Sequence, residues 1–259
     1  MRNRILISLL IALLTAIPAL ASDSCRTHEM ASESLRYNVM FKWGLINKKA
    51  GQAVLTLHRG PESYHTQLTA ASEPWADRFY RVRDTLNGRM EYAGMRPLFY
   101  EKIAHEGKEV KHDQVHYDYS TPGNVIGRCT RREWKEGRQT VDETREMEAE
   151  NSAVDMLTSF YYMRSMPFAE MQPGDSRSVA IFSGKRKETL TIRYVGLDNV
   201  KIGKNYHQTY HVKFTFTSKG GAKTSDDMDA WIGTGSQRIP LKMEGKLPVG
   251  KVQCFYAGE

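Results

Sequence analysis

The feature that most constrains this chain is an alternation of apolar and polar side chains that recurs along most of its length. Apolar residues at every second position give a strand one apolar and one polar face, as in an antiparallel sheet with one solvated face. The alternating segments span residues 35–43, 51–57, 64–71, 115–119, 190–194 and 210–216. Further strands are predicted at 239–243 and 251–255, so most of the chain is expected to be antiparallel β-structure.

Two segments have the period of an amphipathic helix instead. The first, at residues 75–90, follows Pro74 and ends before Gly94, where helices commonly begin and end. Its apolar stripe consists of Trp75, Phe79, Val82, Leu86 and Met90. The second, at residues 152–166, starts with Ser152 and Asp155 in the spacing of a capping box and ends before Pro167.

Together these elements predict a single α+β domain at residues 35–259, mostly antiparallel β-structure, preceded by a tail at 22–34. One-faced strands and two helices with apolar stripes favour an open, curled sheet, or half-barrel, packed around the two amphipathic helices. A turn at residues 171–175 is the best candidate for a boundary between two halves of the domain. With 40% hydrophobic and 26% charged residues, the composition excludes a disordered chain and a protein with many membrane spans.

The first 21 residues have the three parts of a secretory signal peptide. A basic head at residues 1–4 precedes an apolar run at 5–16, and small residues follow Pro18. We expect cleavage between Ala21 and Ser22, and export to the periplasm. The apolar run is shorter than the about 20 residues of a membrane-spanning helix, which makes an uncleaved anchor the less favoured alternative.

Three cysteines, Cys25, Cys129 and Cys254, allow one disulfide in an oxidising compartment. Cys129 and Cys254 both lie in predicted strands and are the favoured pair. Cys25 follows the cleavage site closely, which raises the alternative of an outer-membrane lipoprotein lipidated at this thiol. A lipidation motif has small apolar residues directly before the cysteine, whereas Asp23 lies there in this chain.

The net charge of +7 is mild and is distributed along the sequence. The densest basic runs, at residues 128–132 and 185–187, are each followed at once by a glutamate. Nucleic-acid-binding proteins cluster basic side chains on one face, so this pattern argues against nucleic acid as a partner. It is compatible with a weak attraction to anionic envelope lipids or polysaccharide.

Two histidine pairs, His112/His116 and His207/His211, have the spacing of zinc ligands on a helix, but both lie in predicted strands. Four residues of a strand separate two side chains by about 13 Å, whereas zinc–ligand bonds are about 2 Å long. We therefore expect solvated histidines on the polar faces of the strands and no metal site.

Other catalytic patterns are incomplete. The Gly-Asp-Ser tripeptide at 174–176 resembles the nucleophile motif of one esterase class without its following leucine, and no Gly-x-Ser-x-Gly motif is present. The acidic run at 226–229 lacks the glycine and distal glutamate of a calcium loop. The Gly-Thr-Gly at 233–235 lacks the third glycine of a phosphate-binding loop. The sequence predicts no cofactor and favours a non-enzymatic protein.

A set of short motifs spans residues 35 to 255, nearly the whole predicted domain. They include Leu35-Arg36-Tyr37-Asn38-Val39, Phe79-Tyr80-Arg81-Val82-Arg83-Asp84, Arg96-Pro97-Leu98, Asp155-x3-Ser159-Phe160-Tyr161-Tyr162-x-Arg164, Asp229-Ala230-Trp231-Ile232, Arg238-Ile239-Pro240-Leu241 and Gly250-Lys251-Val252. With these motifs the chain resembles a family of exported Gram-negative proteins known as domain of unknown function 3108. The closing strand departs from the family pattern because it carries Cys254 and ends in a short tail.

The resemblance brings no established activity. It implies an envelope location and a fold similar to the half-barrel of lipoprotein carriers, in which a curled antiparallel sheet can hold an acyl chain. The family motifs on the two predicted helices supply the candidate binding residues: Phe79, Tyr80, Arg83, Asp84, Asp155, Phe160, Tyr161 and Arg164. The four charged ones either form structural ion pairs with one another, the favoured reading, or hold the head group of a ligand.

The leading functional hypothesis is a periplasmic, non-enzymatic protein that binds or carries an amphiphilic envelope component such as a lipid or lipoprotein. The export signal, the one-faced sheet and the aromatic helices motivate it. The alternative is a structural or assembly partner that uses a sheet edge or a surface patch. An envelope hydrolase that uses His112, His116, Ser176 or Asp226 comes third.

Overall fold

The computed structural model describes residues 30–258 except 185, 219–224 and 226, so Ala21, Ser22 and Cys25 lie outside the described residues. Fifteen strands and two short helices form this part of the chain. The strands are β1 (Glu33–Trp43), β2 (Ile46–Arg59), β3 (Tyr64–Ser72), β4 (Val82–Met90), β5 (Pro97–Glu106), β6 (Glu109–Asp118), β7 (Asn124–Lys135), β8 (Arg138–Glu150), β9 (Ala153–Val154), β10 (Ser176–Phe182), β11 (Lys187–Ile202), β12 (Asn205–Ser218), β13 (Met228–Gly233), β14 (Pro240–Lys246) and β15 (Lys251–Gly258). The helices are α1 (Pro74–Asp77) and α2 (Met156–Arg164).

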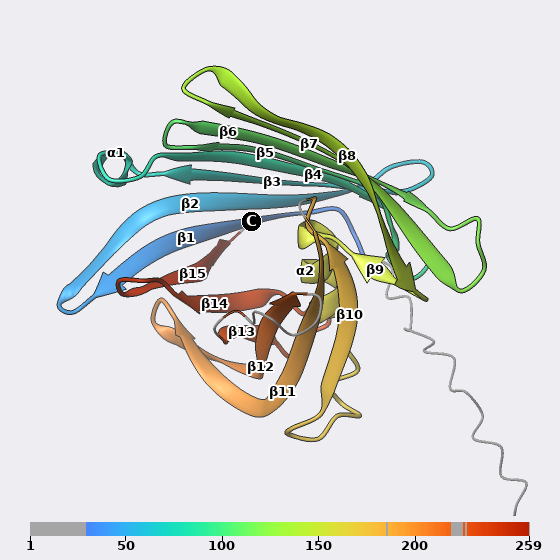
Figure 1. Cartoon of the computed structure of the whole chain (residues 1–259). Coiled ribbons are helices and arrows are strands. Elements are labelled where there is room, and N and C mark those ends of the chain that lie inside the picture. The colour runs from blue at the N-terminus through green and yellow to red at the C-terminus, as the bar shows by residue number, and fades with distance from the viewer. Residues whose placement is uncertain (1–29, 185, 219–224, 226, 259) are drawn as a thin grey trace, which may run out of the picture.

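All fifteen strands belong to one sheet, in the order β8-β7-β6-β5-β4-β3-β2-β1-β15-β14-β13-β12-β11-β10-β9. The sheet curls into a nearly closed barrel, with β1–β8 arching over β10–β15 and α2 between them (Figure 1). Strand accounts for 67% of the structure and helix for 6%. The predicted α+β half-barrel around two amphipathic helices is therefore wrong, because nearly the whole chain is sheet.

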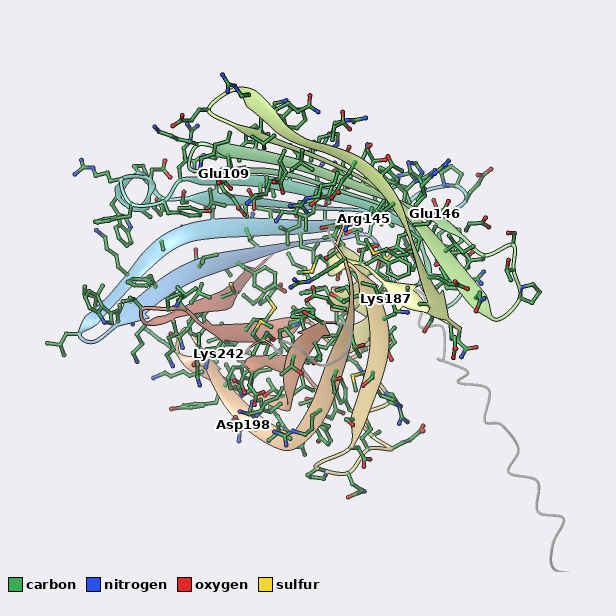
Figure 2. The ribbon with its side chains drawn as sticks, in the orientation of Figure 1. Glu109, Arg145, Glu146, Lys187, Asp198 and Lys242 are labelled. Atoms are coloured by element: carbon green, nitrogen blue, oxygen red, sulfur yellow. The ribbon has the colours of Figure 1, made fainter. Side chains whose placement is uncertain are left out.

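The first and last strands lie side by side in the middle of the sheet. β1 pairs antiparallel with β15, with Arg36 opposite Gly258 and Lys42 opposite Lys251. Two meanders of sequential hairpins, β1–β8 and β10–β15, are thereby joined into one sheet. At the far seam, Lys187 at the start of β11 donates to the carbonyl oxygen of Glu148 in β8 at 2.5 Å (Lys187 is labelled in Figure 2).

The strands predicted from alternation are confirmed. The segments 35–43, 51–57, 64–71, 115–119, 190–194 and 210–216 fall on β1, β2, β3, β6, β11 and β12, with only Tyr119 beyond a strand end. The closing pair becomes β14 and β15. Leu35, Tyr37, Leu55 and Leu57 are buried on the inner face, which is the face that the alternation marks as apolar.

The helix predicted at residues 75–90 is wrong. Only Pro74–Asp77 are helical, and β4 begins at Val82. Val82, Leu86 and Met90 are spaced by four residues, and a spacing of four fits one face of a strand as well as one face of a helix. Sheet pairing to β3 and β5 decided between the two.

The second predicted helix is present but shorter. α2 covers Met156–Arg164, and its N-cap is Asp155 rather than Ser152. The residues after Ser152, Ala153–Val154, form β9 and pair parallel with β10. Pro167 lies just beyond the helix end, as predicted. Neither helix in the described part of the chain is long and apolar enough to cross a membrane.

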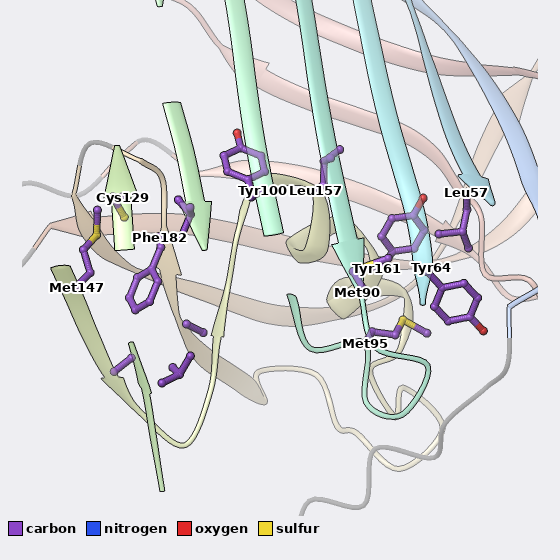
Figure 3. Packing of buried hydrophobic residues seen from close by; sticks show 14 of the residues in the cluster. Leu57, Tyr64, Met90, Met95, Tyr100, Cys129, Met147, Leu157, Tyr161 and Phe182 are labelled. Atoms are coloured by element: carbon purple, nitrogen blue, oxygen red, sulfur yellow. The ribbon is translucent and has the colours of Figure 1, made fainter. Parts of the chain in front are cut away.

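The core lies on both sides of α2. Leu157 and Tyr161 pack among inward residues of the first meander, including Tyr64, Met90 and Tyr100 (Figure 3). The opposite side of α2 and the segment that follows it pack on β10–β14. From α2 and the segment that follows it, the residues packed on these strands are Met163, Met166, Phe168 and Met171. α2 is thus a plug inside the barrel rather than a cover on one face.

Close packing inside the barrel leaves no room for a side chain at Gly127 of β7. A Cβ there would lie 2.7 Å from Cε2 of Phe182, which is fully buried. We expect Gly127→Ala to lower the free energy of unfolding by about 1–3 kcal/mol because the ring or the strand must move. The matched control is Gly245→Ala in β14, where the nearest side-chain atom is 3.5 Å away. Chemical denaturation of both variants checks this, and equal stabilities would contradict it.

Candidate functional site

Asp155 is a fully buried carboxyl group at the start of α2. Its Oδ1 accepts the backbone N–H groups of Leu157 and Thr158, each at 2.8 Å, and its Oδ2 accepts the Thr158 hydroxyl at 2.9 Å. These bonds satisfy helix N–H groups that have no partner inside the helix. Burial nevertheless raises the pKa of Asp155 to about 6, against the opposing effect of these hydrogen bonds. The residue holds α2 in place and is not presented to a ligand.

Arg164 at the end of α2 forms a buried, two-pronged ion pair with Glu33 of β1. The distances are 2.5 Å from Nη1 to Oε1 and 2.9 Å from Nη2 to Oε2, and the two side chains are 2% and 7% exposed. Nη2 also donates to the carbonyl oxygen of Gln237 at 2.8 Å. This pair fastens the helix to the strand at the centre of the sheet, so Arg164 has a structural role here.

The other charged candidates pair elsewhere. Arg83 pairs with Asp77 at 2.7 Å, and Asp84 accepts the backbone N–H of His105 at 3.2 Å. The four charged candidates therefore form no ion pair with one another, contrary to the favoured prediction. Each is held by a different part of the chain.

The aromatic candidates are divided between the interior and the surface. Tyr161 is buried, and its hydroxyl lies 3.1 Å from Oγ1 of Thr66. Phe160 is half-buried beside the ring of Tyr37. Phe79 and Tyr80 follow α1 and are exposed, far from α2 along the strands. The structure therefore does not bring the eight candidates into one site.

The predicted disulfide is not formed, because Cys129 and Cys254 are free thiols in the structure. Cys129 lies on β7 and Cys254 on β15, with six strands between them in the sheet. Both sit among apolar side chains, and burial raises the pKa of the Cys129 thiol to about 12 and of the Cys254 thiol to about 11. Neither thiol is activated for nucleophilic chemistry.

One side of the barrel interior is apolar but incompletely covered. Starting from Tyr37, which packs against Phe160 of α2, every second residue along β1 and its neighbours β12–β15 faces inward. We call the half-buried ones among them the apolar inner wall: Val39, Phe41, Phe214, Phe216, Met228, Met243, Val252, Cys254 and Tyr256. Val212, Ala230 and Ile232, which face inward on the same strands, are instead fully buried in the core. Water therefore reaches apolar surface on the inside of the barrel.

The inner face of β4–β7 is charged toward the same end of the barrel. Lys102 lies between the fully buried Tyr100 and Ala104 on β5, so it faces inward, and it is opposite Asp113. We call the whole group the charged inner wall: Asp84, Lys102, Glu106, Lys111, Asp113, Arg131 and Glu133. Strands β2 and β3 separate it from the apolar inner wall. The interior is therefore amphipathic.

Ion pairs connect the charged inner wall. Arg131 pairs with Asp113 at 3.3 Å and also with Glu133, while Lys111 pairs with Glu106 at 3.1 Å. Burial raises the pKa of Asp113, against the charge of Arg131. For Glu106, burial opposes ionisation, but hydrogen bonds and charges from the two neighbouring lysines hold its pKa below the usual value. Lys102 also lies 3.8 Å from Glu106, and the side chains of Lys102 and Lys111 remain 29% and 26% exposed.

Neither wall was predicted from the sequence as a site. A signal for the charged inner wall was nevertheless present in β5, where Tyr100, Lys102, Ala104 and Glu106 share one alternating phase. Charged side chains in the apolar phase of a strand mark a polar patch inside a barrel.

The histidine pairs lie on strands, as predicted, and one histidine of each pair lies beside a carboxylate. His112 Nε2 is 2.8 Å from Glu101 Oε1 on the neighbouring strand. His211 is 2.7 Å from Asp229 and stacks on Trp231 at 4.6 Å. Within the described residues, no group of three or more His, Cys, Asp or Glu side chains could hold a metal ion.

The remaining catalytic candidates form no constellation. Asp175 accepts the N–H of Gln172 within the turn before β10, and Ser176 begins that strand. Asp226 lies outside the described residues. No described residue therefore completes a nucleophile–base arrangement around them.

Two shallow hollows lie outside the two inner walls. One, of about 680 Å³, runs over β2–β6 and includes His58, His65, Arg89 and His116. The other, of about 510 Å³, lies beside the β13–β14 connection. Both are wide open, and neither is lined by a predicted binding residue. The amphipathic interior is the stronger candidate because its apolar lining is partly shielded from water.

Comparison with known proteins gives a family and a fold. No curated protein matches the chain. A crystal structure of a β-barrel-like protein of domain of unknown function DUF1849 from Brucella abortus is similar, with a TM-score of 0.61 and 10% sequence identity. The match covers 88% of this chain and 97% of that one, and at this identity it shows the fold alone. The family model "Protein of unknown function (DUF3108)" matches residues 36–255. The chain therefore belongs to the DUF3108 family.

Proposed function

We propose that this protein binds an amphiphilic molecule inside its barrel, with the apolar chain along the apolar inner wall and the polar group toward the charged inner wall. A single observation carries the proposal. Nine apolar or weakly polar side chains face the interior on β1 and β12–β15 yet stay half-buried. Apolar surface left in contact with water inside a fold is a favourable place for a ligand, because binding removes it from water.

The two walls suit an amphiphile better than a wholly apolar ligand. Lys102 and Lys111 both pair with Glu106 on the charged inner wall, remain partly exposed and face the same interior. A carboxylate or phosphate near these ammonium groups would gain charge-assisted hydrogen bonds. Tyr37 lies next to the apolar inner wall, beside Phe160 of α2. Its hydroxyl is buried and has no hydrogen-bond partner among the described residues. It is a second polar group that a ligand could satisfy.

We also propose that the protein acts in the periplasm without catalysing a reaction. Residues 1–21 have the layout of a secretory signal, which supports export. The free cysteine side chains and the paired histidines supply no nucleophile–base arrangement. A mass measured for the protein from its own periplasm tests cleavage after Ala21, and an intact N-terminus there would contradict it.

The alternative, an assembly partner that pairs through a sheet edge, has less support. The edge strand β8 (Arg138–Glu150) carries seven charged residues among its thirteen. Charged side chains on an edge are a common protection against pairing with another chain.

The test of the binding proposal uses dansyl-undecanoic acid, whose fluorescence rises when it leaves water. We expect saturable binding to the purified protein, and at least tenfold weaker binding to Gly245→Trp. A side chain at 245 would point along the apolar inner wall, since its Cβ would contact Met228 at 3.5 Å and Val252 at 3.9 Å. An indole there occupies the place of the acyl chain.

The matched control is Gly235→Trp, at a position with open space around it in the β13–β14 connection. It should bind the probe like the unmodified protein, and thermal unfolding should show that both variants are folded. Absence of saturable binding by the unmodified protein would overturn the function. Unchanged binding by folded Gly245→Trp would overturn the placement of the ligand.

A further inference from the structure

We propose that one rim of the barrel docks onto the surface of an anionic lipid bilayer. Three connections with the strand ends beside them form this rim, here called the apolar rim: residues 42–49 at the β1–β2 turn, 73–83 around α1, and 245–252 at the β14–β15 turn. Eleven large apolar side chains are exposed among the described residues, and seven of them lie in these segments. They are Trp43, Leu45, Ile46, Phe79, Tyr80, Leu247 and Val249.

The three connections are neighbours in space as well as in the sheet order. All three lie at the same end of the barrel, on the left of Figure 1. Gly250 in the third approaches the first so closely that a Cβ there would lie 2.9 Å from Cβ of Trp43. The second connection joins the first through Trp75, whose indole N–H donates to the carbonyl oxygen of Lys49 at 2.7 Å and whose ring lies 4.5 Å from Nζ of Lys48. The exposed apolar residues therefore form one patch.

The degree of exposure is unusual for residues of this kind. Leu45 is fully exposed at a turn tip, and Phe79 is 83% exposed. Single exposed apolar residues are normal, but a contiguous patch marks an interaction site. Aromatic side chains beside aliphatic tips are the composition that favours the bilayer–water interface.

The charge around the patch identifies the surface it fits. The three segments carry eight basic side chains and only two carboxylates, Glu73 and Asp77. With eight basic and two acidic side chains, the three segments carry a net charge of +6. Lys42 and Lys251 lie directly opposite each other on β1 and β15, and Lys251 also pairs with Glu244 of β14 at 2.6 Å. Apolar tips ringed by lysine and arginine complement an anionic bilayer, to which each basic residue adds about fivefold in affinity.

The apolar rim continues into the proposed binding site. Val252 and Phe41 of the apolar inner wall lie only two residues from Gly250 and Trp43 along the same strands. A rim seated on a bilayer would place the mouth of the barrel at the level of the lipid head groups. The seven exposed apolar side chains of the rim are distinct from those of the apolar inner wall.

Flotation with vesicles tests the docking. We expect the protein to float with phosphatidylcholine–phosphatidylglycerol vesicles at a 3:1 ratio, and at least tenfold less with phosphatidylcholine alone. The triple variant Leu45→Asp, Phe79→Asp and Leu247→Asp should lose at least tenfold in vesicle affinity. The control is the double variant Leu197→Asp and Tyr206→Asp, which changes exposed apolar residues outside the apolar rim and should float normally.

The outcomes separate this inference from the proposed function. A triple variant that still binds dansyl-undecanoic acid but no longer floats supports docking. Failure of the unmodified protein to float, or unchanged flotation of the triple variant, overturns the inference. So does light scattering that shows a dimer of the unmodified protein broken by the triple variant, because the patch would then bind a second copy of the chain.

Discussion

Arg164→Met is expected to lower the free energy of unfolding by about 3–5 kcal/mol. The substitution leaves the carboxylate of Glu33, which is 7% exposed, without the guanidinium that neutralises it. An uncompensated buried charge is among the most destabilising changes that one substitution can make. Denaturation in urea, followed by tryptophan fluorescence and circular dichroism, measures the change.

Two further variants give this prediction its control. Arg83→Met breaks the Arg83–Asp77 pair, whose side chains are 36% and 24% exposed, and should cost about 1 kcal/mol or less. Adding Glu33→Gln to Arg164→Met removes the unpaired buried charge and should recover part of the lost free energy of unfolding. Equal losses from Arg164→Met and Arg83→Met would show that the buried pair does not hold α2 to the sheet.

The second large effect is a dependence of stability on pH that arises at Asp155. Its pKa is about 6 in the folded protein, compared with 3.8 as the ordinary value. The folded state therefore keeps a proton that the unfolded state has already released, so this group stabilises the protein at low pH and loses that effect as the pH rises from about 4 to 6. A pKa that is higher by about two in the folded state corresponds to about 3 kcal/mol of folding free energy.

Asp155→Asn isolates this contribution. Asparagine caps a helix about as well as aspartate but has no charge to bury, so the variant should lack the loss of stability between pH 4 and 7. Asp155→Ala removes the cap and should be less stable at every pH. Denaturation midpoints of the three proteins at pH 4, 5, 6 and 7 provide the measurement. Parallel curves for the unmodified protein and Asp155→Asn would mean that Asp155 does not titrate in this range.

Local pattern predicted the strands well because alternation records which face of a strand is buried. It failed at residues 75–90, where a spacing of four residues fits both a helix and a strand. Only the pairing of this segment with β3 and β5 makes it a strand. It also could not reveal how far the sheet would curl. Closure depends on pairing between β1 and β15, which are more than 200 residues apart in sequence, and no local pattern encodes such a contact.

The candidate site was harder to predict than the fold. Arg164 was identified from its motif, but its partner Glu33 lies 131 residues away, in a segment that we had read as a tail. Phe79 and Tyr80 were grouped with α2 on the assumption of a helix, and the sheet places them on the apolar rim instead. The two inner walls combine residues from many strands. Their chemistry is visible only once the register of the sheet is known.

The pairing of the first strand with the last has a consequence for biosynthesis. Each meander can assemble from neighbouring hairpins as the chain lengthens, because its contacts are local. Joining the two requires β15, and Arg36 meets its partner only when Gly258 has been made. The emerging polypeptide thus cannot close its central seam before β15 has left the ribosome. That delay keeps the barrel open while the strands from β1 to β14 are being made.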